Sequence, residues 1–372
     1  MVEVREVKTR KEIKEFINFP LELYKDCELY VPVLYVDELK IFKKNYVYNE
    51  TCDVVFYNAY RDGKVVGRIQ GIVQKAANKK WNQNRARFTR FDSINDLEVS
   101  RALFEKVTSW AKEKGVDEVV GPLGYSDLER EGLLIWGFDQ LGTYEEQYNY
   151  EYYQALIEDF GFEKEIDWVE NKLYLPEVKD EKFHRVCEHL LERYNLRLVQ
   201  PKSINEFIKK YLNQFFHILD VTYDRIYGTV PFTKKMIDTM VDGFKLLVRP
   251  KDLVLLLNDK DECMGFALTF PSISKIVNKH KGHITPGFLI DFFKTKKNPE
   301  VLDLGLIGVD PSLESKGVAT AMIKFLQDSL ENEHYDHLET NLMLENNYHI
   351  QNLNKRFKVE YNKRRRCFIK KI

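Results

Sequence analysis

The stretch Leu304–Leu326, LGLIGVDPSLESKGVATAMIKFL, decides the fold that the sequence predicts. It begins as an apolar strand that ends at Val309, continues as a short polar loop, and becomes an amphipathic helix from Gly317 onward. A glycine at the start of a helix lets backbone N–H groups approach a ligand, and the helix dipole favours an anion there. The stretch therefore predicts a phosphate site. The alternative is that Gly317 and Ala319 only permit close packing of the helix on a sheet.

The elements on both sides of this stretch extend the pattern through the second half of the chain. A hairpin precedes it, formed by Leu253–Leu257 and Cys263–Phe270 around a polar turn. A strand, a short helix and a last strand follow it, at Tyr335–Leu344, Tyr348–Phe357 and Arg364–Ile369. Hairpins combined with helical crossovers predict an α/β (α+β) fold whose sheet is partly antiparallel and partly parallel.

The first half repeats this order of elements. Two strand-like segments, Asp53–Tyr60 and Lys64–Val73, flank a tight turn. Asn95 and Glu98 then form a capping-box arrangement at the start of a helix whose apolar residues fall on one face. A strand, a glycine-rich loop, a second helix and a closing strand at Trp168–Leu175 complete the half. The chain therefore contains two copies of one predicted topology.

Matching positions support this duplication. Gly67 and Gly265, each in the second strand of a predicted hairpin, are 198 residues apart. Pro176 and the charged residues after it have the composition of a linker. We therefore expect two tandem domains, residues 1–176 and residues 177–372.

The second half resembles the GNAT family of acyl-CoA-dependent N-acyltransferases over Asp252–Ile372. The strand, the Asp-Pro turn, the Lys-Gly-Val-Ala loop and the helix of Leu304–Leu326 carry the likeness, together with the late helix. The resemblance implies a V-shaped sheet that holds acetyl-CoA or another acyl-CoA as co-substrate. The strand backbone then pairs with the pantetheine, and the loop amides bind the pyrophosphate. The coenzyme-binding residues that it implies are Ile307, Gly308, Val309, Lys316, Gly317, Val318, Ala319, Thr320 and Asn347.

Two positions depart from the family pattern. Glu314 stands where the family usually has Arg or Gln, three residues before the glycine, and a carboxylate beside a pyrophosphate is unfavourable. Asn354 replaces the tyrosine that often protonates the leaving group, and an amide cannot supply a proton at neutral pH. Tyr348 is close in sequence, but we expect it to have a packing role. Leaving-group protonation then requires water or another residue.

Acyl transfer to an amine requires a base that removes a proton and N–H donors that stabilise the tetrahedral oxyanion. The backbone of Ile307–Val309 can supply the donors. The candidate bases are acidic residues on or beside the two strands that should flank the coenzyme, namely Asp303, Glu345 and Glu339. For each of them the alternative is an ordinary solvated carboxylate.

The first half resembles the same fold more loosely. Gly63–Arg68 in its hairpin and Asn149–Tyr153 before its late helix carry the likeness, but the loop Ile94–Glu98 is acidic and lacks glycine. We therefore expect a degenerate copy that binds no pyrophosphate and shapes the acceptor side or the domain interface. The glycine-rich loop Gly121–Phe138 is a candidate pocket wall, with a loop folded onto its own domain as the alternative.

Composition argues against several other classes. The 372 residues carry 57 Lys plus Arg against 58 Asp plus Glu, so no overall field attracts nucleic acid or a membrane. No apolar run is as long as a membrane span, and the first residues lack the apolar core of a signal peptide. The 5 cysteines and the scattered histidines form neither a disulfide framework nor a metal site. We expect a cytoplasmic protein without a membrane partner, a nucleic-acid partner or a metal.

The basic run Lys363–Arg366 near the C-terminus has two interpretations. Such a patch can hold a coenzyme phosphate or an RNA backbone. Its polar and apolar residues do not alternate between two clear faces, so we expect an exposed edge strand kept soluble by its charge.

Together these features favour an N-acyltransferase, for example an N-acetyltransferase, that moves an acyl group from acyl-CoA to a small-molecule or peptide amine. Two alternatives stay open. Fem-type aminoacyl transferases also join two such halves and draw on aminoacyl-tRNA, although the near-zero net charge weakens this interpretation. A non-catalytic acyl-CoA sensor would account for Glu314 and Asn354.

Overall fold

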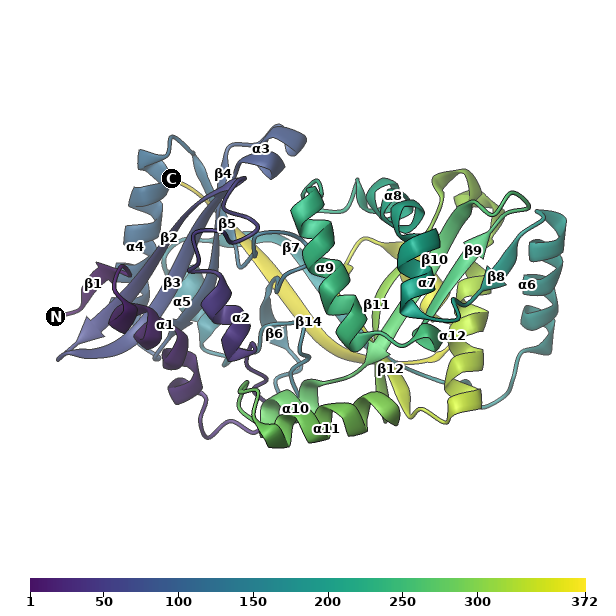
Figure 1. Cartoon of the computed structure of the whole chain (residues 1–372). Coiled ribbons are helices and arrows are strands. Elements are labelled where there is room, and N and C mark those ends of the chain that lie inside the picture. Colours follow the sequence, from purple (N-terminus) through teal and green to yellow (C-terminus); the bar gives the residue numbers. More distant parts are fainter.

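One mixed sheet of 14 strands runs through both halves of the protein (Figure 1). The computed structural model describes residues 1–372. Neighbouring strands follow the order β1-β2-β3-β4-β5-β14-β7-β12-β11-β10-β9-β8, while β6 pairs with β14 and β13 pairs with β7. The strands are β1 (Glu3–Glu6), β2 (Cys52–Arg61), β3 (Lys64–Gln74), β4 (Arg85–Ser93), β5 (Glu118–Gly121), β6 (Leu133–Trp136), β7 (Glu163–Tyr174), β8 (Arg197–Val199), β9 (Leu253–Leu257), β10 (Cys263–Pro271), β11 (Val301–Val309), β12 (His337–Thr340), β13 (Met343–Leu344) and β14 (Lys358–Lys371).

Helices pack against this sheet in both halves. In the first half α4 contacts β2 and β3, and in the second half α8 contacts β10 and β11. None of the helices is both long enough and apolar enough to cross a membrane. The helices are α1 (Arg10–Leu23), α2 (Tyr35–Lys40), α3 (Lys75–Trp81), α4 (Leu97–Glu113), α5 (Tyr153–Asp159), α6 (Glu181–Arg193), α7 (Ile204–Lys210), α8 (Leu212–Tyr223), α9 (Lys234–Leu247), α10 (Ser274–Lys279), α11 (Pro286–Lys297), α12 (Ala319–Glu333) and α13 (Tyr348–Asn354).

The predicted fold class, an α/β architecture with a mixed sheet, is confirmed. The pairs β4–β5 and β11–β12 are parallel, whereas the hairpins β2–β3 and β9–β10 are antiparallel. The helix predicted after Asn95 is also confirmed as α4, but its N-cap is the next residue. The Asp96 carboxylate accepts hydrogen bonds from the backbone N–H groups of Glu98 and Val99. A carboxylate there satisfies free amides of the first turn and complements the helix dipole.

The last strand of each half lies beside the other half. Strand β14, from the end of the chain, lies between β5 and β7, and β7 in turn pairs with β12. In Figure 1, β14 runs in yellow through the centre of the molecule. The long antiparallel pairing of β7 with β14, from Tyr174–Lys358 to Glu163–Ile369, therefore joins the two halves into one sheet. The predicted linker at Pro176 lies between β7 and α6.

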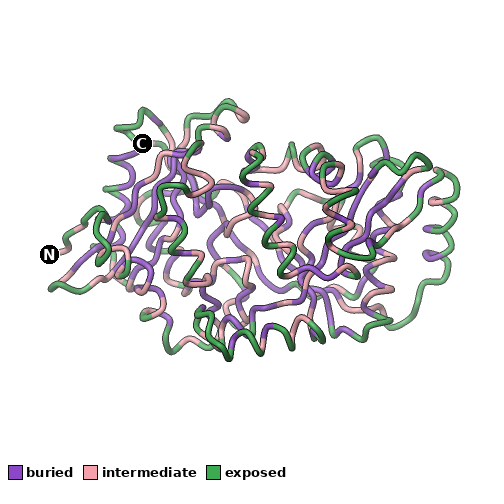
Figure 2. Tube along the Cα trace, in the orientation of Figure 1, coloured by how far each residue is buried: buried purple, intermediate pink, exposed green.

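The expectation of an exposed C-terminal edge strand is wrong. Strand β14 has neighbours on both sides, and the side chain of Arg365 is 0% exposed. Its Nε donates a hydrogen bond of 2.5 Å to Glu170 of β7, while Arg364 and Arg366 bind Asp167. The basic run therefore neutralises carboxylates of the first half instead of facing solvent. Figure 2 shows buried residues concentrated along the strands at this junction.

In each half the two parallel strands diverge. Strand β4 pairs with β5 only over Arg85–Arg87, and β11 pairs with β12 only over Val301–Leu304. Each longer strand also has a bulge beyond its paired part. In β4 the bulge, relative to β3, contains Arg90, whose φ is 47°. In β11 the extra residue relative to β10 is Gly305. Bulges bend a strand and redirect its side chains, so both halves open a gap at the same place in their topology.

Candidate functional site

A large cavity lies between the two halves, at both bulges. Its volume is about 490 Å³, within the usual range for small-molecule sites. Elements α1, α2, β3 and β4 of the first half line it, together with α9, β10 and β11 of the second half. Arg90 and Gly305 both lie in its wall. Neither half alone forms this cavity.

The cavity wall is apolar on the side of the second half and strongly acidic elsewhere. Met240, Phe244, Leu268 and Leu306 contribute apolar surface from α9, β10 and β11. The polar wall contains more carboxyl groups than guanidinium groups, but burial raises the pKa of Asp127, Glu145 and Glu146, so the excess of negative charge is smaller than the number of groups. The carboxylates are Asp37, Glu38, Asp92, Asp127, Glu129, Glu145 and Glu146, and the guanidinium groups are Arg68, Arg90 and Arg130.

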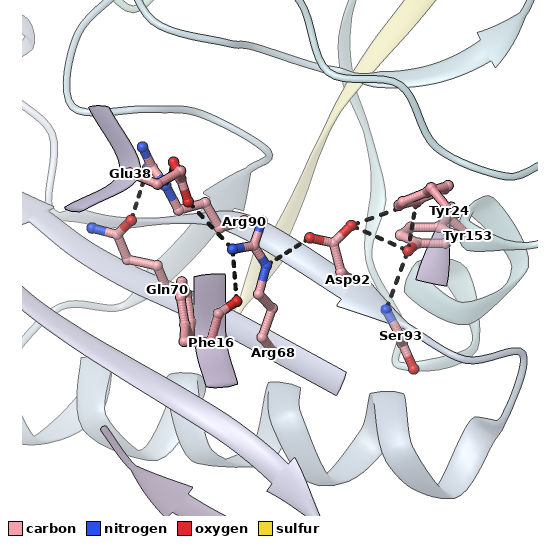
Figure 3. A network of polar contacts seen from close by, with 9 residues as sticks. All are labelled: Phe16, Tyr24, Glu38, Arg68, Gln70, Arg90, Asp92, Ser93 and Tyr153. Carbon is pink, nitrogen blue, oxygen red and sulfur yellow. Dashed lines mark hydrogen bonds and ion pairs between the residues drawn. The ribbon is translucent and has the colours of Figure 1, made fainter. Parts of the chain in front are cut away.

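Part of this charge is fixed in a buried network (Figure 3). Arg68 donates to Asp92 at 2.7 Å and to Glu38 at 3.3 Å, and Arg90 donates to Glu38 at 2.8 Å. Tyr153 extends the network from α5 by donating to Asp92 at 3.3 Å. Burial acts to raise the pKa of Glu38, but the two arginines outweigh burial and lower it. These carboxylates are compensated, so they form a wall and are not available as bases.

Glu145, by contrast, faces the cavity without a side-chain partner. It is half-buried in the loop before α5, and it lines both the large cavity and a small adjoining one of about 10 Å³. Burial raises the pKa of Glu145 to about 7, and the nearby charges of Glu339 and Glu170 act in the same direction. A carboxyl group with this pKa changes protonation at neutral pH, as a general base must.

Asp303 lies beside Glu145 at the small cavity, together with Glu339. It is 5% exposed, and neither of its carboxyl oxygens has a hydrogen-bond partner. Burial, then the charges of Glu145 and Glu339, raise the pKa of Asp303 well above its ordinary value. For Glu339 burial also acts to raise the pKa, but the nearby His337 imidazole, whose Nε2 lies 3.6 Å from the carboxylate, and the charge of Lys363 lower it. The site therefore combines an ionised Glu339, a protonated Asp303 and Glu145, which changes protonation near neutral pH.

The predicted phosphate loop has the backbone geometry of an anion site. Gly317 has φ of 73°, in the left-handed region, and α12 begins two residues later. The N–H groups of Gly317 and Val318 donate to no acceptor within the protein. Glu314 is exposed, and the Lys316 ammonium lies 5.1 Å from the centre of the Tyr194 ring. The loop therefore offers free amides, whereas its lysine lies on a neighbouring aromatic ring.

The predicted pantetheine strand carries a hydrogen bond that the sequence did not indicate. The Tyr223 hydroxyl, at the end of α8, lies 3.3 Å from the carbonyl oxygen of Ile307 and 3.4 Å from its amide nitrogen. Burial raises the pKa of Tyr223 to about 12. The same backbone groups of Ile307 that the resemblance assigns to pantetheine are thus paired with a tyrosine.

Three further predicted residues lie away from the cavity. Glu345 is 28% exposed and forms ion pairs with Arg364 at 2.6 Å and with Lys164 at 2.7 Å. Asn347 caps α13 by accepting from a backbone N–H, and Asn354 is buried against a methionine sulfur. These contacts give each of the three a structural partner.

The corresponding gap of the first half is filled by aromatic side chains. The Tyr153 hydroxyl accepts from the N–H of Ser93, and the Tyr152 hydroxyl donates to the Ser93 carbonyl at 2.7 Å. Both tyrosines come from the start of α5, so side chains of the protein satisfy the open edge of β4. The expectation that this half binds no pyrophosphate stays a prediction, and this packing agrees with it.

Two curated proteins resemble the chain over most of its length. Protein YghO of Escherichia coli is 25% identical over 384 residues, which cover 99% of this chain and 95% of that protein. The bacterial ceramide synthase of Caulobacter vibrioides is 24% identical over 286 residues, which cover 75% of this chain and 72% of that protein. No protein-family model matches the chain.

A solved structure decides the architecture. The tandem GNAT protein from the clavulanic acid biosynthesis pathway aligns with a TM-score of 0.55 at 11% identity, over 100% of this chain and 98% of its own. The chain is a tandem GNAT-fold protein. The resemblance predicted from the Leu304–Leu326 stretch is therefore confirmed at the level of the fold.

In this tandem GNAT-fold protein, sequence reasoning identified Asp303 but missed Glu145 and Tyr223. Glu145 belongs to a loop of the first half, and nothing in the local sequence distinguishes it from a solvated glutamate. Tyr223 is the last residue of α8, and its contact with Ile307 joins two residues that are 84 positions apart in the sequence. A search for tyrosines at helix ends near the gap between the two diverging parallel strands would have found it. In the first half Tyr152 and Tyr153 likewise bond the backbone of the strand beside that gap.

Proposed function

We propose that this protein is an acyl-CoA-dependent N-acyltransferase whose acceptor is an amine with a long apolar chain. The observation that carries the proposal is Glu145, a carboxyl group with a pKa of about 7, in an acidic cavity that both halves of a tandem GNAT fold enclose. Asp303 lies next to it at the junction of the two cavities. Glu145 can accept the proton that an ammonium group must lose before it attacks.

Acyl-CoA is proposed to bind along β11 and the following loop. The free N–H groups of Gly317 and Val318, at the start of the 15-residue helix α12, suit a pyrophosphate. The pantetheine would take over the hydrogen bonds that Tyr223 makes to Ile307. This path leads the thioester to the bulge at Gly305, where β11 forms part of the cavity wall.

The reaction then follows from the positions of these groups. Glu145 takes a proton from the acceptor ammonium, and the neutral nitrogen attacks the thioester carbonyl. The C–N bond forms, the nitrogen loses a second proton to water, and the C–S bond breaks, so the products are an amide and the free thiol of CoA. A phenol with a pKa of about 12 is a weak proton donor, so Tyr223 is assigned only a hydrogen bond to the departing sulfur. The thiolate takes its proton from Glu145.

The acceptor class rests on two supports. The apolar wall from α9, β10 and β11 suits a hydrocarbon chain, and the uncompensated carboxylates suit an ammonium head group. One relative bears the name ceramide synthase, an activity that forms an amide between a fatty acyl group and a long-chain amine. We therefore propose a long-chain amino alcohol or a similar lipid amine as acceptor.

The test is an amine-dependent transfer assay with the full chain. Acetyl-CoA and palmitoyl-CoA are each combined with a long-chain amino alcohol, a short alkylamine or no amine. Release of the CoA thiol and formation of the amide are followed by a thiol reagent and by mass spectrometry. We expect both products with the long-chain amine, and a loss of about 10²-fold or more in Glu145→Gln.

Other outcomes would replace the proposal. Acyl-CoA binding by calorimetry without transfer to any amine would favour the non-catalytic sensor. Stabilisation by aminoacyl-tRNA but not by acyl-CoA would favour a Fem-type transferase. Full activity in Glu145→Gln would place the base elsewhere.

A further inference from the structure

Helix α11 presents an apolar face that no part of the protein covers. Its inner side packs into a small core through Phe288 and Phe292. Its outer side carries Leu289, Ile290 and Phe293, which are 45%, 70% and 60% exposed. Figure 1 places α11 along the lower edge of the molecule, and Figure 2 shows exposed residues along its outer side. A helix with apolar residues on all sides is normally buried, so this face requires an explanation.

Lysines surround the apolar face. Residues 274–298 contain six lysines and one aspartate, in a chain whose net charge is −1. Asp291 is paired with Lys279 at 2.7 Å. Lys281, Lys294 and Lys297 are exposed, and no carboxylate lies within ion-pair distance of them. We call Ile284, Leu289, Ile290 and Phe293, with these three unpaired lysines, the α11 face.

The α11 face lies beside elements that line the large cavity. The Tyr35 ring of α2 stacks on His283 with centroids 5.0 Å apart, and its N–H donates to Gly282 at 2.9 Å. Leu247 at the end of α9 packs in the same small core as α11. Tyr35 and Leu247 both line the cavity. A surface that bound the α11 face would therefore lie close to the cavity.

This feature belongs to the second half alone. The connection between β3 and β4 contains only the short helix α3, whereas the matching connection between β10 and β11 contains both α10 and α11. The extra segment adds no strand to the sheet. Its inner side forms a core of only 6 buried residues, so most of its apolar surface is not explained by folding.

We propose that the α11 face binds the surface of an anionic lipid bilayer. A helix of 12 residues is about 18 Å long and can lie in the interface, with its apolar side chains among the acyl chains and its lysines at the head groups. A second copy of the chain is a poor occupant, because it would bring the same lysines against each other. The predicted absence of a membrane partner rested on the overall charge, whereas folding concentrates positive charge at this face.

The test is flotation of the full chain with vesicles of phosphatidylcholine alone or mixed with phosphatidylglycerol. We expect binding to the anionic vesicles that weakens with added salt. Changing Lys281, Lys294 and Lys297 to Gln should weaken it about a hundredfold, from about fivefold per lysine. The double variant Ile290→Glu with Phe293→Glu should abolish binding, while Val178→Glu, an 81% exposed position far from α11 in sequence, is the matched control.

Each outcome decides the matter independently of the proposed transferase activity, because no readout uses catalysis. Circular dichroism confirms that the variants are folded. Vesicle binding that persists in the double Glu variant would overturn the assignment of the face. Absence of binding to both vesicle types would overturn the proposal, and a dimer in sedimentation that the double variant dissociates would show instead an interface between copies.

Discussion

Replacing Glu145 with glutamine should remove activity and at the same time stabilise the protein at alkaline pH. The pKa of Glu145 is raised from its ordinary value of 4.5 to about 7, mainly by burial. A group whose pKa is higher in the folded state holds its proton more tightly there. Ionisation therefore costs stability as the pH rises from about 4.5 to about 7, and the cost persists at higher pH.

The size of the effect follows from the same shift. The difference of about 2.5 pH units corresponds to about 3 kcal/mol, and Glu145→Gln removes it because the amide carries no charge. A chain of 372 residues has an unfolding entropy of about 0.8 kcal/mol/K. The melting temperature should therefore rise by about 4 °C at pH 8 and by only about 1 °C at pH 5.

The assay pairs thermal melting with the rate of CoA release at several pH values. In the wild type the rate should rise with pH to a plateau above pH 7, and in Glu145→Gln it should fall by about 10²-fold to 10⁴-fold. The control is Glu345→Gln, because Glu345 is ion-paired and faces away from the cavity. That variant should keep its rate and lose less than about 1 kcal/mol. A Glu145→Gln protein that melts at a lower temperature than wild type at pH 8 would refute the reasoning.

Three further predictions concern the loop, the buried ion pair and the domain boundary. Gly317→Asp should abolish acetyl-CoA binding in calorimetry. The control is Gly63→Asp, because Gly63 has a φ of 74° and open space around it; this variant should cost the same backbone strain of about 1 to 2 kcal/mol as Gly317→Asp and keep its affinity for acetyl-CoA. Equal affinity in the two variants would remove the loop from the site. Arg365→Met should lower stability by about 3 to 5 kcal/mol in denaturant titration, because Glu170 is left buried without its 2.5 Å partner, and an unchanged midpoint would contradict this. The fragment 1–176 lacks β14 and should show no cooperative melting transition; a sharp one would mean that the first half folds alone.

Local patterns identified much of the fold in advance. The hairpin strands β2 and β3 were expected almost to the residue, since alternation and a tight turn are local signals. The helix after the Lys-Gly-Val-Ala loop was also expected from local sequence, although α12 begins at Ala319 and not at Gly317. Helix α1 was missed although Thr9 and the residues after it form a capping box.

The sequence by itself determined the element types, the duplication and the GNAT-type order of strands and helices, because each depends on residues within a few positions of one another. Only the tertiary structure decided that β14 crosses into the first half, that Arg365 is buried against a glutamate 195 positions away, and that Glu145 and Asp303 meet at one cavity. Burial and pKa depend on such distant neighbours. The chemistry of the site therefore arises between the two halves, which no local pattern encodes.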